Sequence, residues 1–107
     1  QRELAALRDA LLALPSKRLI RGALDNPEGD VCAIGAYGRH KGIDLAKYDP
    51  EDSSDEVGID AGMPRMVAWK VIEMNDEYLD RMTPEERYVK MLAWVQGRLK
   101  GKHGEKH

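Results

Sequence analysis

The tetrapeptide Thr83-Pro84-Glu85-Glu86 constrains the fold of this chain more than any other feature, because it specifies where a helix begins. A threonine at the N-cap accepts a hydrogen bond from the amide three residues later, and a glutamate at that later position bonds back to the threonine amide. Pro84 fits the first helical position, where its missing amide proton would have no partner. The pattern predicts a helix from Thr83 to about Gly101, whose apolar face carries Tyr88, Leu92, Val95 and Leu99, flanked by Met91 and Trp94.

Two earlier segments have the apolar periodicity of helices. Residues 2–14 place four leucines on one helical stripe, which Pro15 ends. Residues 63–74 are apolar around most of the helix circumference, which predicts a central buried helix against which the C-terminal helix packs. Pro64 fits the first turn of this helix. Asn75 is expected to end it, because asparagine accepts the left-handed conformation found at helix ends.

The segment 31–42 predicts a further helix with Gly35 and Gly38 on one face. Glycine within a helix costs about 1 kcal/mol relative to alanine, so these glycines predict that another backbone packs very close. Upstream, a dense cluster of turn residues at 25–30 would allow a short β-hairpin near residues 18–32. The expected fold is mainly α: one domain over residues 1–107, a helical bundle of about four helices.

Charge is distributed unevenly along the chain. The formal net charge of −2 provides no overall attraction to nucleic acid or to anionic membranes. Residues 44–60, however, contain seven carboxylates against Lys47 alone and are expected to form an acidic surface loop, whereas residues 100–107 form a basic polar tail. This loop is the predicted partner-binding surface, complementing a basic partner or imitating a phosphate backbone, through Asp49, Glu51, Asp52, Asp55 and Glu56.

The single cysteine, Cys32, excludes an internal disulfide, whereas small secreted domains usually depend on several. The N-terminal segment is interrupted by charges, so we expect neither a signal peptide nor a membrane span there. Both features favour a cytoplasmic location. Membrane binding is not predicted.

Candidate chemistry is sparse. Cys32 lies near a predicted helix N-terminus, where a thiol could become a nucleophile, but His40 is about 12 Å away along one helix. A buried structural cysteine is the favoured interpretation. The possible soft metal ligands, Cys32, His40, His103 and His107, are not paired at zinc-site spacing. A calcium loop beginning at Asp49 would have Ser54 where glycine is required. No catalytic residue, metal or cofactor is therefore predicted.

A basic alternative is also open. Arg39 and Lys41 lie close together in the sequence, and with Arg18, Arg21 and the tail lysines they could contact phosphates. The alternative function is therefore a nucleic-acid-associated factor, and a small enzyme using Cys32 comes last.

Five short motifs occur in order over most of the chain: Gly29-Asp30-Val31-Cys32-Ala33-Ile34-Gly35-Ala36, Gly42-Ile43-Asp44, Val57-Gly58-Ile59, Asn75-Asp76-Glu77 and Thr83-Pro84-Glu85-Glu86-Arg87. This pattern resembles a family of small proteins common in bacteriophage and prophage regions. The resemblance implies a genomic setting and a fold, and no reaction. The matching positions of first interest are Cys32, Gly35, Ala36, Asn75, Asp76 and Thr83.

Two expectations follow from this resemblance. Asn75 and Asp76 are expected to anchor the loop before the last helix through side-chain bonds to backbone. The leading functional hypothesis is a non-enzymatic phage or prophage accessory protein in the bacterial host. It would bind a host or phage protein, inhibition of a bacterial defence system being one such role.

Overall fold

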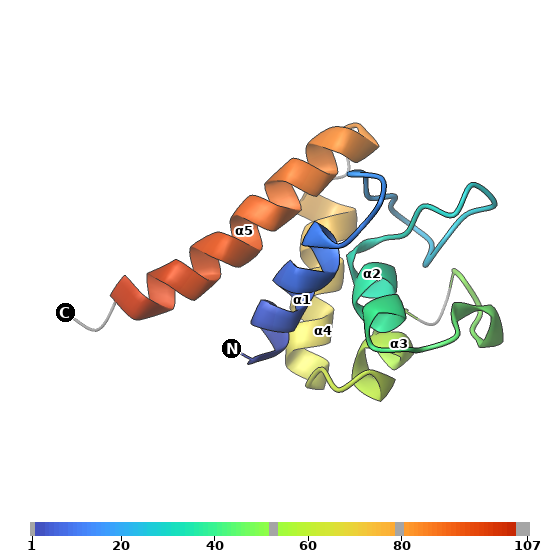
Figure 1. Ribbon diagram of the computed structural model, residues 1–107, viewed down its shortest axis with the longest axis horizontal. Coiled ribbons are helices and arrows are strands. Elements are labelled where there is room, and N and C mark those ends of the chain that lie inside the picture. The colour runs from blue at the N-terminus through green and yellow to red at the C-terminus, as the bar shows by residue number, and fades with distance from the viewer. Residues whose placement is uncertain (1, 52–53, 79–80, 105–107) are drawn as a thin grey trace.

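The computed structural model describes residues 2–51, 54–78 and 81–104 (Figure 1). The described residues form a mainly helical fold, as predicted. Its elements in chain order are α1 (Arg2–Leu12), α2 (Ala33–His40), the 3₁₀ turn η1 (Leu45–Lys47), α3 (Ser54–Asp60), α4 (Arg65–Glu73), the π-helical turn η2 (Met74–Tyr78) and α5 (Pro84–Gly104).

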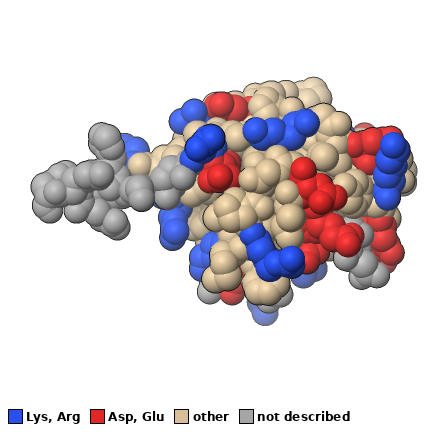
Figure 2. All heavy atoms as spheres, turned by 90° about the horizontal axis from the view of Figure 1, so that it is seen from below, with Lys and Arg blue, Asp and Glu red and all other residues tan. Residues whose placement is uncertain are grey.

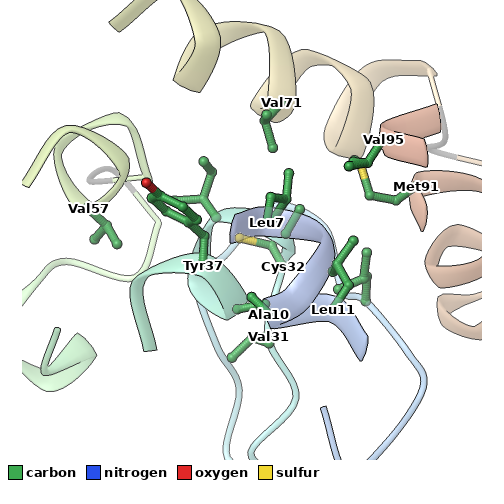
Figure 3. Packing of buried hydrophobic residues seen from close by; sticks show 14 of the residues in the cluster. Leu7, Ala10, Leu11, Val31, Cys32, Tyr37, Val57, Val71, Met91 and Val95 are labelled. Atoms are coloured by element: carbon green, nitrogen blue, oxygen red, sulfur yellow. The ribbon is translucent and has the colours of Figure 1, made fainter. Parts of the chain in front are cut away.

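Helix α1 lies at the centre of the fold and packs against both α2 and α5 (Figure 1). Its leucine stripe forms much of the core, and Leu7 and Leu11 are completely buried. Figure 3 shows side chains from several helices converging around Leu7. The carbonyl groups at the end of α1 are satisfied by other side chains: Lys17 Nζ donates to Leu12 and Leu14 at 2.7 Å, and the Tyr88 hydroxyl donates to Leu11 at 2.9 Å.

The glycines of α2 permit close packing. A Cβ atom at Gly35 would overlap the carbonyl oxygen of Leu24, so the predicted close approach of another backbone is confirmed there. At Gly38 the close neighbour is instead the Val57 side chain of α3. A larger residue at either position would push α2 away from its neighbours.

The hairpin allowed by the turn cluster does not form. Between α1 and α2 the chain has two isolated bridges, from Leu19 and from Asp25 to Val31, and no continuous ladder. Leu19, Leu24 and Val31 are all buried, so this segment enters the core as an irregular loop. We call residues 13–32 the core loop.

The acidic segment is also more ordered than predicted, because residues 44–60 contain η1 and α3 as well as loop. Asp44 caps η1 by accepting a hydrogen bond from the Ala46 amide at 3.1 Å. Helix α3 packs on α2 and buries Val57 and Gly58. Packing of these two residues against α2 stabilises the helix even though the segment is highly charged. Asp52 lies outside the described residues.

Helix α4 is amphipathic, and the prediction that it is a central buried helix is wrong. It buries Ala68 and Val71, but Met66 is 75% exposed and Trp69 52% exposed. Pro64 occupies the N-cap position. Asn75 does not end the helix in a left-handed conformation, because no described non-glycine residue has a positive φ. The chain instead widens into the π-helical turn η2, which contains Asn75.

The predicted capping box of α5 is confirmed. The Thr83 amide donates to Glu86 Oε1 at 3.0 Å, and the Glu86 amide donates to Thr83 Oγ1 at 3.1 Å. The helix continues to Gly104, beyond the predicted end. It packs on α1 and η2 rather than on α4, which corrects the predicted partner. Buried Tyr88, Met91 and Val95 hold its first half to the core, while its C-terminal end projects from the body (Figure 1).

Candidate functional site

Cys32 is the N-cap of α2 and belongs to the core. Its Sγ accepts a hydrogen bond from the Gly35 amide at 3.3 Å, and the side chain is buried. This burial raises the pKa of the thiol to about 11. A thiol of that pKa is protonated at neutral pH and is a poor nucleophile. The structural interpretation of Cys32 is confirmed, and the environment lacks what the nucleophile hypothesis requires.

Asn75 and Asp76 anchor a different loop from the one predicted. Asn75 Oδ1 accepts from the Ala33 amide at the start of α2 at 3.1 Å. Its Nδ2 donates to the Ile20 carbonyl at 3.0 Å and to Asp76 Oδ1 at 2.8 Å. Asp76 Oδ1 also accepts from the Gly22 amide at 3.3 Å. The pair therefore fixes the core loop and the beginning of α2 through Asn75 Oδ1, Asn75 Nδ2 and Asp76 Oδ1.

Arg87 is a structural residue that the sequence interpretation missed. Only 3% exposed, it donates to the Leu19 carbonyl at 2.8 Å and to the Met82 carbonyl at 2.9 Å. It joins the start of α5 to the core loop. Arg87 is the last residue of the motif that begins at Thr83, and this was the sequence signal that it has a specific role. Its burial was not expected, because arginine is usually exposed.

Three of the four cations of the nucleic-acid alternative, Arg18, Arg21 and Arg39, contact carboxylates or carbonyl oxygens of the fold, and Lys41 lies over an aromatic ring. Arg18 forms ion pairs with Asp30 and Glu85, both at 3.2 Å. Arg39 donates to the Gly29 carbonyl at 3.2 Å. The remaining two contacts are those of Arg21 Nε with the Asp76 carbonyl at 3.0 Å and of Lys41 with the Tyr37 ring at 5.8 Å.

Arg18 and Arg39 also line a common cleft of about 280 Å³. Glu28 and Asp30 line the same cleft, so its charge is mixed. A phosphate entering it would meet two carboxylates together with the two guanidinium groups. This arrangement gives little preference for anions.

The acidic surface is formed by Asp49, Glu51, Asp55 and Glu56, near η1 and α3. Within the described part of the chain, no ion pair neutralises these carboxylates. Some are used locally: Asp49 Oδ1, for example, accepts from the Glu51 amide at 2.9 Å. In Figure 2 the larger groups of acidic side chains lie in the half of the molecule away from the C-terminal end of α5, with basic side chains among them.

An apolar groove lies between α4 and the projecting half of α5, and it was not predicted. We call it the α4–α5 groove. Its volume is about 320 Å³, and its lining residues are Glu3, Leu4, Met66, Val67, Lys70, Trp94 and Arg98. The groove is left open because α5 packs on α1 instead of on α4.

Two arginine–tryptophan pairs occur here, each with the side chains four residues apart on one helix: Trp94 and Arg98 line the groove, whereas Arg65 and Trp69 lie outside its lining on the outer face of α4. The Arg98 guanidinium lies 5.7 Å from the ring centroid of Trp94. On α4, the Arg65 guanidinium lies 5.9 Å from the ring centroid of Trp69. Trp69 follows Met66 by three residues, a spacing that places the two side chains side by side on a helix. The apolar surface thus continues from the groove onto the outer face of α4.

The sequence did contain a signal for this surface. Met66 and Trp69 are three residues apart and lie off the stripe that faces the core. A second apolar stripe on a helix indicates either a second buried face or a binding face, and the first of these had been predicted.

Other features limit the kinds of site present. No group of three or more His, Cys, Asp or Glu residues with metal-binding geometry occurs among the described residues. None of the described helices is both long enough and apolar enough to cross a membrane. Comparison with protein-family models, curated proteins and solved structures finds no match for this chain.

Proposed function

We propose that this domain is a non-enzymatic protein-binding module whose contact surface is the α4–α5 groove together with the outer face of α4. The observation that carries this proposal is the exposure of Met66 and Trp69, 75% and 52%, beside an apolar groove. Contiguous exposed apolar surface is characteristic of interaction sites. Tryptophan, methionine and arginine are also the side chains enriched at protein interfaces, and tryptophan and arginine dominate their binding energy.

The other candidate sites support protein binding over the alternatives. Cys32 is buried with a raised pKa, so the best nucleophile in the sequence is withheld from substrates. Arg18 and Arg39, the two arginines that line the mixed-charge cleft, contact protein groups at the surface, and a binding phosphate would have to compete with Asp30 and Glu85 for Arg18. A protein partner at the α4–α5 groove needs neither access to Cys32 nor release of Arg18 from its ion pairs.

The setting we propose is a bacteriophage or prophage, with the domain acting in the cytoplasm of the bacterial host on a host or phage protein. The ordered motifs that resemble phage proteins support this setting. Inhibition of a bacterial defence system is one role of that kind. The acidic surface of Asp49, Glu51, Asp55 and Glu56 would contribute by accelerating association with a basic region of the partner, an effect that falls with ionic strength.

The test is capture from a lysate of phage-infected bacteria, followed by measurement of affinity with each purified captured protein. The double variant Met66→Ser/Trp69→Ser is expected to weaken binding at least about tenfold, because apolar anchors supply most interface energy. Val89→Ser is the matched control, since Val89 is 60% exposed on α5 and does not line the groove. Equal affinity for the double variant and the wild type, with both folded by circular dichroism, would refute the proposed surface.

A separate variant tests the acidic surface. Reversing Asp49, Glu51, Asp55 and Glu56 to lysine is expected to slow association and to remove its dependence on salt, with a smaller effect on dissociation. Unchanged association kinetics together with an intact biological effect would eliminate the acidic surface from the function.

A further inference from the structure

We propose that the α4–α5 groove receives an acidic amphipathic helix of the partner, whose apolar side chains lie between α4 and α5 and whose carboxylates bind Arg98 and Arg65. This inference rests on the proposed protein-binding function. It goes further by specifying the chemistry of the bound segment.

The shape of the site favours a helix. Every wall of the groove is helical, being formed by α1, α4 and α5, and no strand is present among the described residues to accept a β-strand by augmentation. Helical peptides bind such grooves with apolar residues at spacings of three and four. On α5 the groove is lined by Trp94 and Arg98, which are roughly 6 Å apart along the helix axis at 1.5 Å per residue, and this span matches about one turn of a partner helix.

The charge around the groove favours acidic flanks on that helix. Lys70 of α4 is paired with Glu73 at 3.7 Å, and Glu3 on the α1 wall also has a partner. In contrast, Arg65 and Arg98 form no ion pair within the described part of the chain. The cations available for new ion pairs at this surface are therefore these two guanidinium groups.

Stacking on tryptophan prepares both arginines for carboxylates. A guanidinium that lies over an aromatic ring keeps its in-plane N–H donors free, and two of these donors match the oxygens of one carboxylate. The ring also restricts the side chain before binding, so less rotamer entropy is lost when the ion pair forms. The Trp94–Arg98 and Trp69–Arg65 pairs would each combine an apolar contact with a carboxylate-binding group.

The test uses three synthetic 18-residue helical peptides with the full-length protein. The first has a leucine stripe flanked by glutamates, the second the same stripe flanked by lysines, and the third the glutamates with serines in place of the leucines. Tryptophan fluorescence and calorimetry report binding. The acidic leucine peptide is expected to bind at least about tenfold more tightly than either of the others, and its affinity should fall as salt is raised.

Single substitutions then locate the contact. Arg98→Gln and Arg65→Gln are each expected to weaken the acidic peptide about tenfold without altering circular dichroism, since each removes a charge-assisted hydrogen-bond donor set. Arg81→Gln, at an exposed arginine that belongs to neither α4 nor α5, is expected to leave the affinity unchanged. Equal losses for all three variants would overturn the assignment, because they would reflect net charge alone.

Three results would overturn the inference in different ways. Stronger binding of the lysine peptide would refute the acidic chemistry while leaving the protein-binding function intact. Binding to vesicles rich in phosphatidylglycerol, lost in Arg98→Gln, would identify the surface as a membrane contact. A concentration-dependent dimer in sedimentation, lost in Met66→Ser, would make a second copy of this chain the occupant. If the peptides fail and Met66→Ser/Trp69→Ser also leaves the captured partner bound, the proposed function falls as well.

Discussion

The substitution Asn75→Ala tests whether the buried amide of η2 holds the core loop in place. Asn75 is 2% exposed and makes three hydrogen bonds, to the Ala33 amide, the Ile20 carbonyl and Asp76 Oδ1. Alanine removes all three. It leaves the Ala33 amide buried without its partner, whereas Asp76 keeps its bond from the Gly22 amide.

The expected loss can be worked out from these contacts. An unsatisfied buried amide costs about 1–3 kcal/mol, and the loss of an ordinary hydrogen bond, as at the half-buried Ile20 carbonyl, about 0.5–1.5 kcal/mol. The free energy of unfolding should therefore fall by about 1.5–4.5 kcal/mol, a large fraction of the total for a domain of this size. At about 4–8 °C per kcal/mol, the melting temperature should fall by at least about 6 °C.

Urea unfolding followed by circular dichroism at 222 nm measures this loss, and an unchanged m-value would show that the denatured state is unaltered. Asn26→Ala is the matched control, because the Asn26 side chain accepts one hydrogen bond, from the Asp30 amide at 3.0 Å, in a partly buried turn. If Asn75→Ala cost no more than Asn26→Ala, the reasoning that η2 anchors the core loop would be refuted.

Three further predictions concern helix capping, close packing and the buried thiol. Thr83→Ala should lower the free energy of unfolding by about 1 kcal/mol, whereas Thr83→Ser should largely preserve it; equal losses in urea titrations would contradict a capping role. Gly35→Ala should destabilise the fold by about 1–3 kcal/mol, because the new Cβ would overlap the Leu24 carbonyl. Gly97→Ala, at an exposed position with no neighbour within 4 Å, should stabilise it by up to about 1 kcal/mol. If both variants shifted the melting temperature in the same direction, the packing argument would be contradicted. Since burial raises the Cys32 pKa from 9.0 to about 11, the unfolded chain releases the thiol proton first, so the free energy of unfolding should fall as pH rises from 9.0 towards about 11. Cys32→Ala should flatten that slope in unfolding measurements across this range, and an unaltered slope would show that the thiol does not cause it.

Local signals predicted α1, α2, α4 and α5, whereas α3 lies in a segment that was expected to be a loop. The Thr83 capping box depends on four consecutive residues, and the leucine stripe of α1 is a simple periodicity, so both could be interpreted without knowing the rest of the chain. The close approach at Gly35 was also predicted, because glycine inside a helix needs a reason. In each case the residues that determine the structure lie within one helical turn or on one face of one helix.

What the sequence did not predict depends on contacts between distant segments. The apolar face of α5 was compatible with packing on either α1 or α4, and the choice of α1 leaves Met66 and Trp94 lining a groove. Asn75 resembled a helix terminator because its local preferences are those of a terminator. Its partners, Ile20 and Ala33, are 55 and 42 residues away, and nothing near Asn75 indicates them. The candidate binding surface was missed for the same reason, since it exists only because of this packing choice.

The core loop has a consequence for the order in which the chain can fold. Two of its backbone carbonyls accept hydrogen bonds from residues that are translated much later. The Leu19 carbonyl accepts from Arg87, 68 residues further along the chain, and the Ile20 carbonyl accepts from Asn75. At about 5–20 residues per second, these partners emerge from the ribosome several seconds after the loop. During that interval the core loop can form its internal bonds, such as that from the Ile20 amide to the Val31 carbonyl at 3.0 Å, but the Leu19 and Ile20 carbonyls lack their side-chain partners. The native connection between α1 and α2 is therefore completed only when η2 and the beginning of α5 are available.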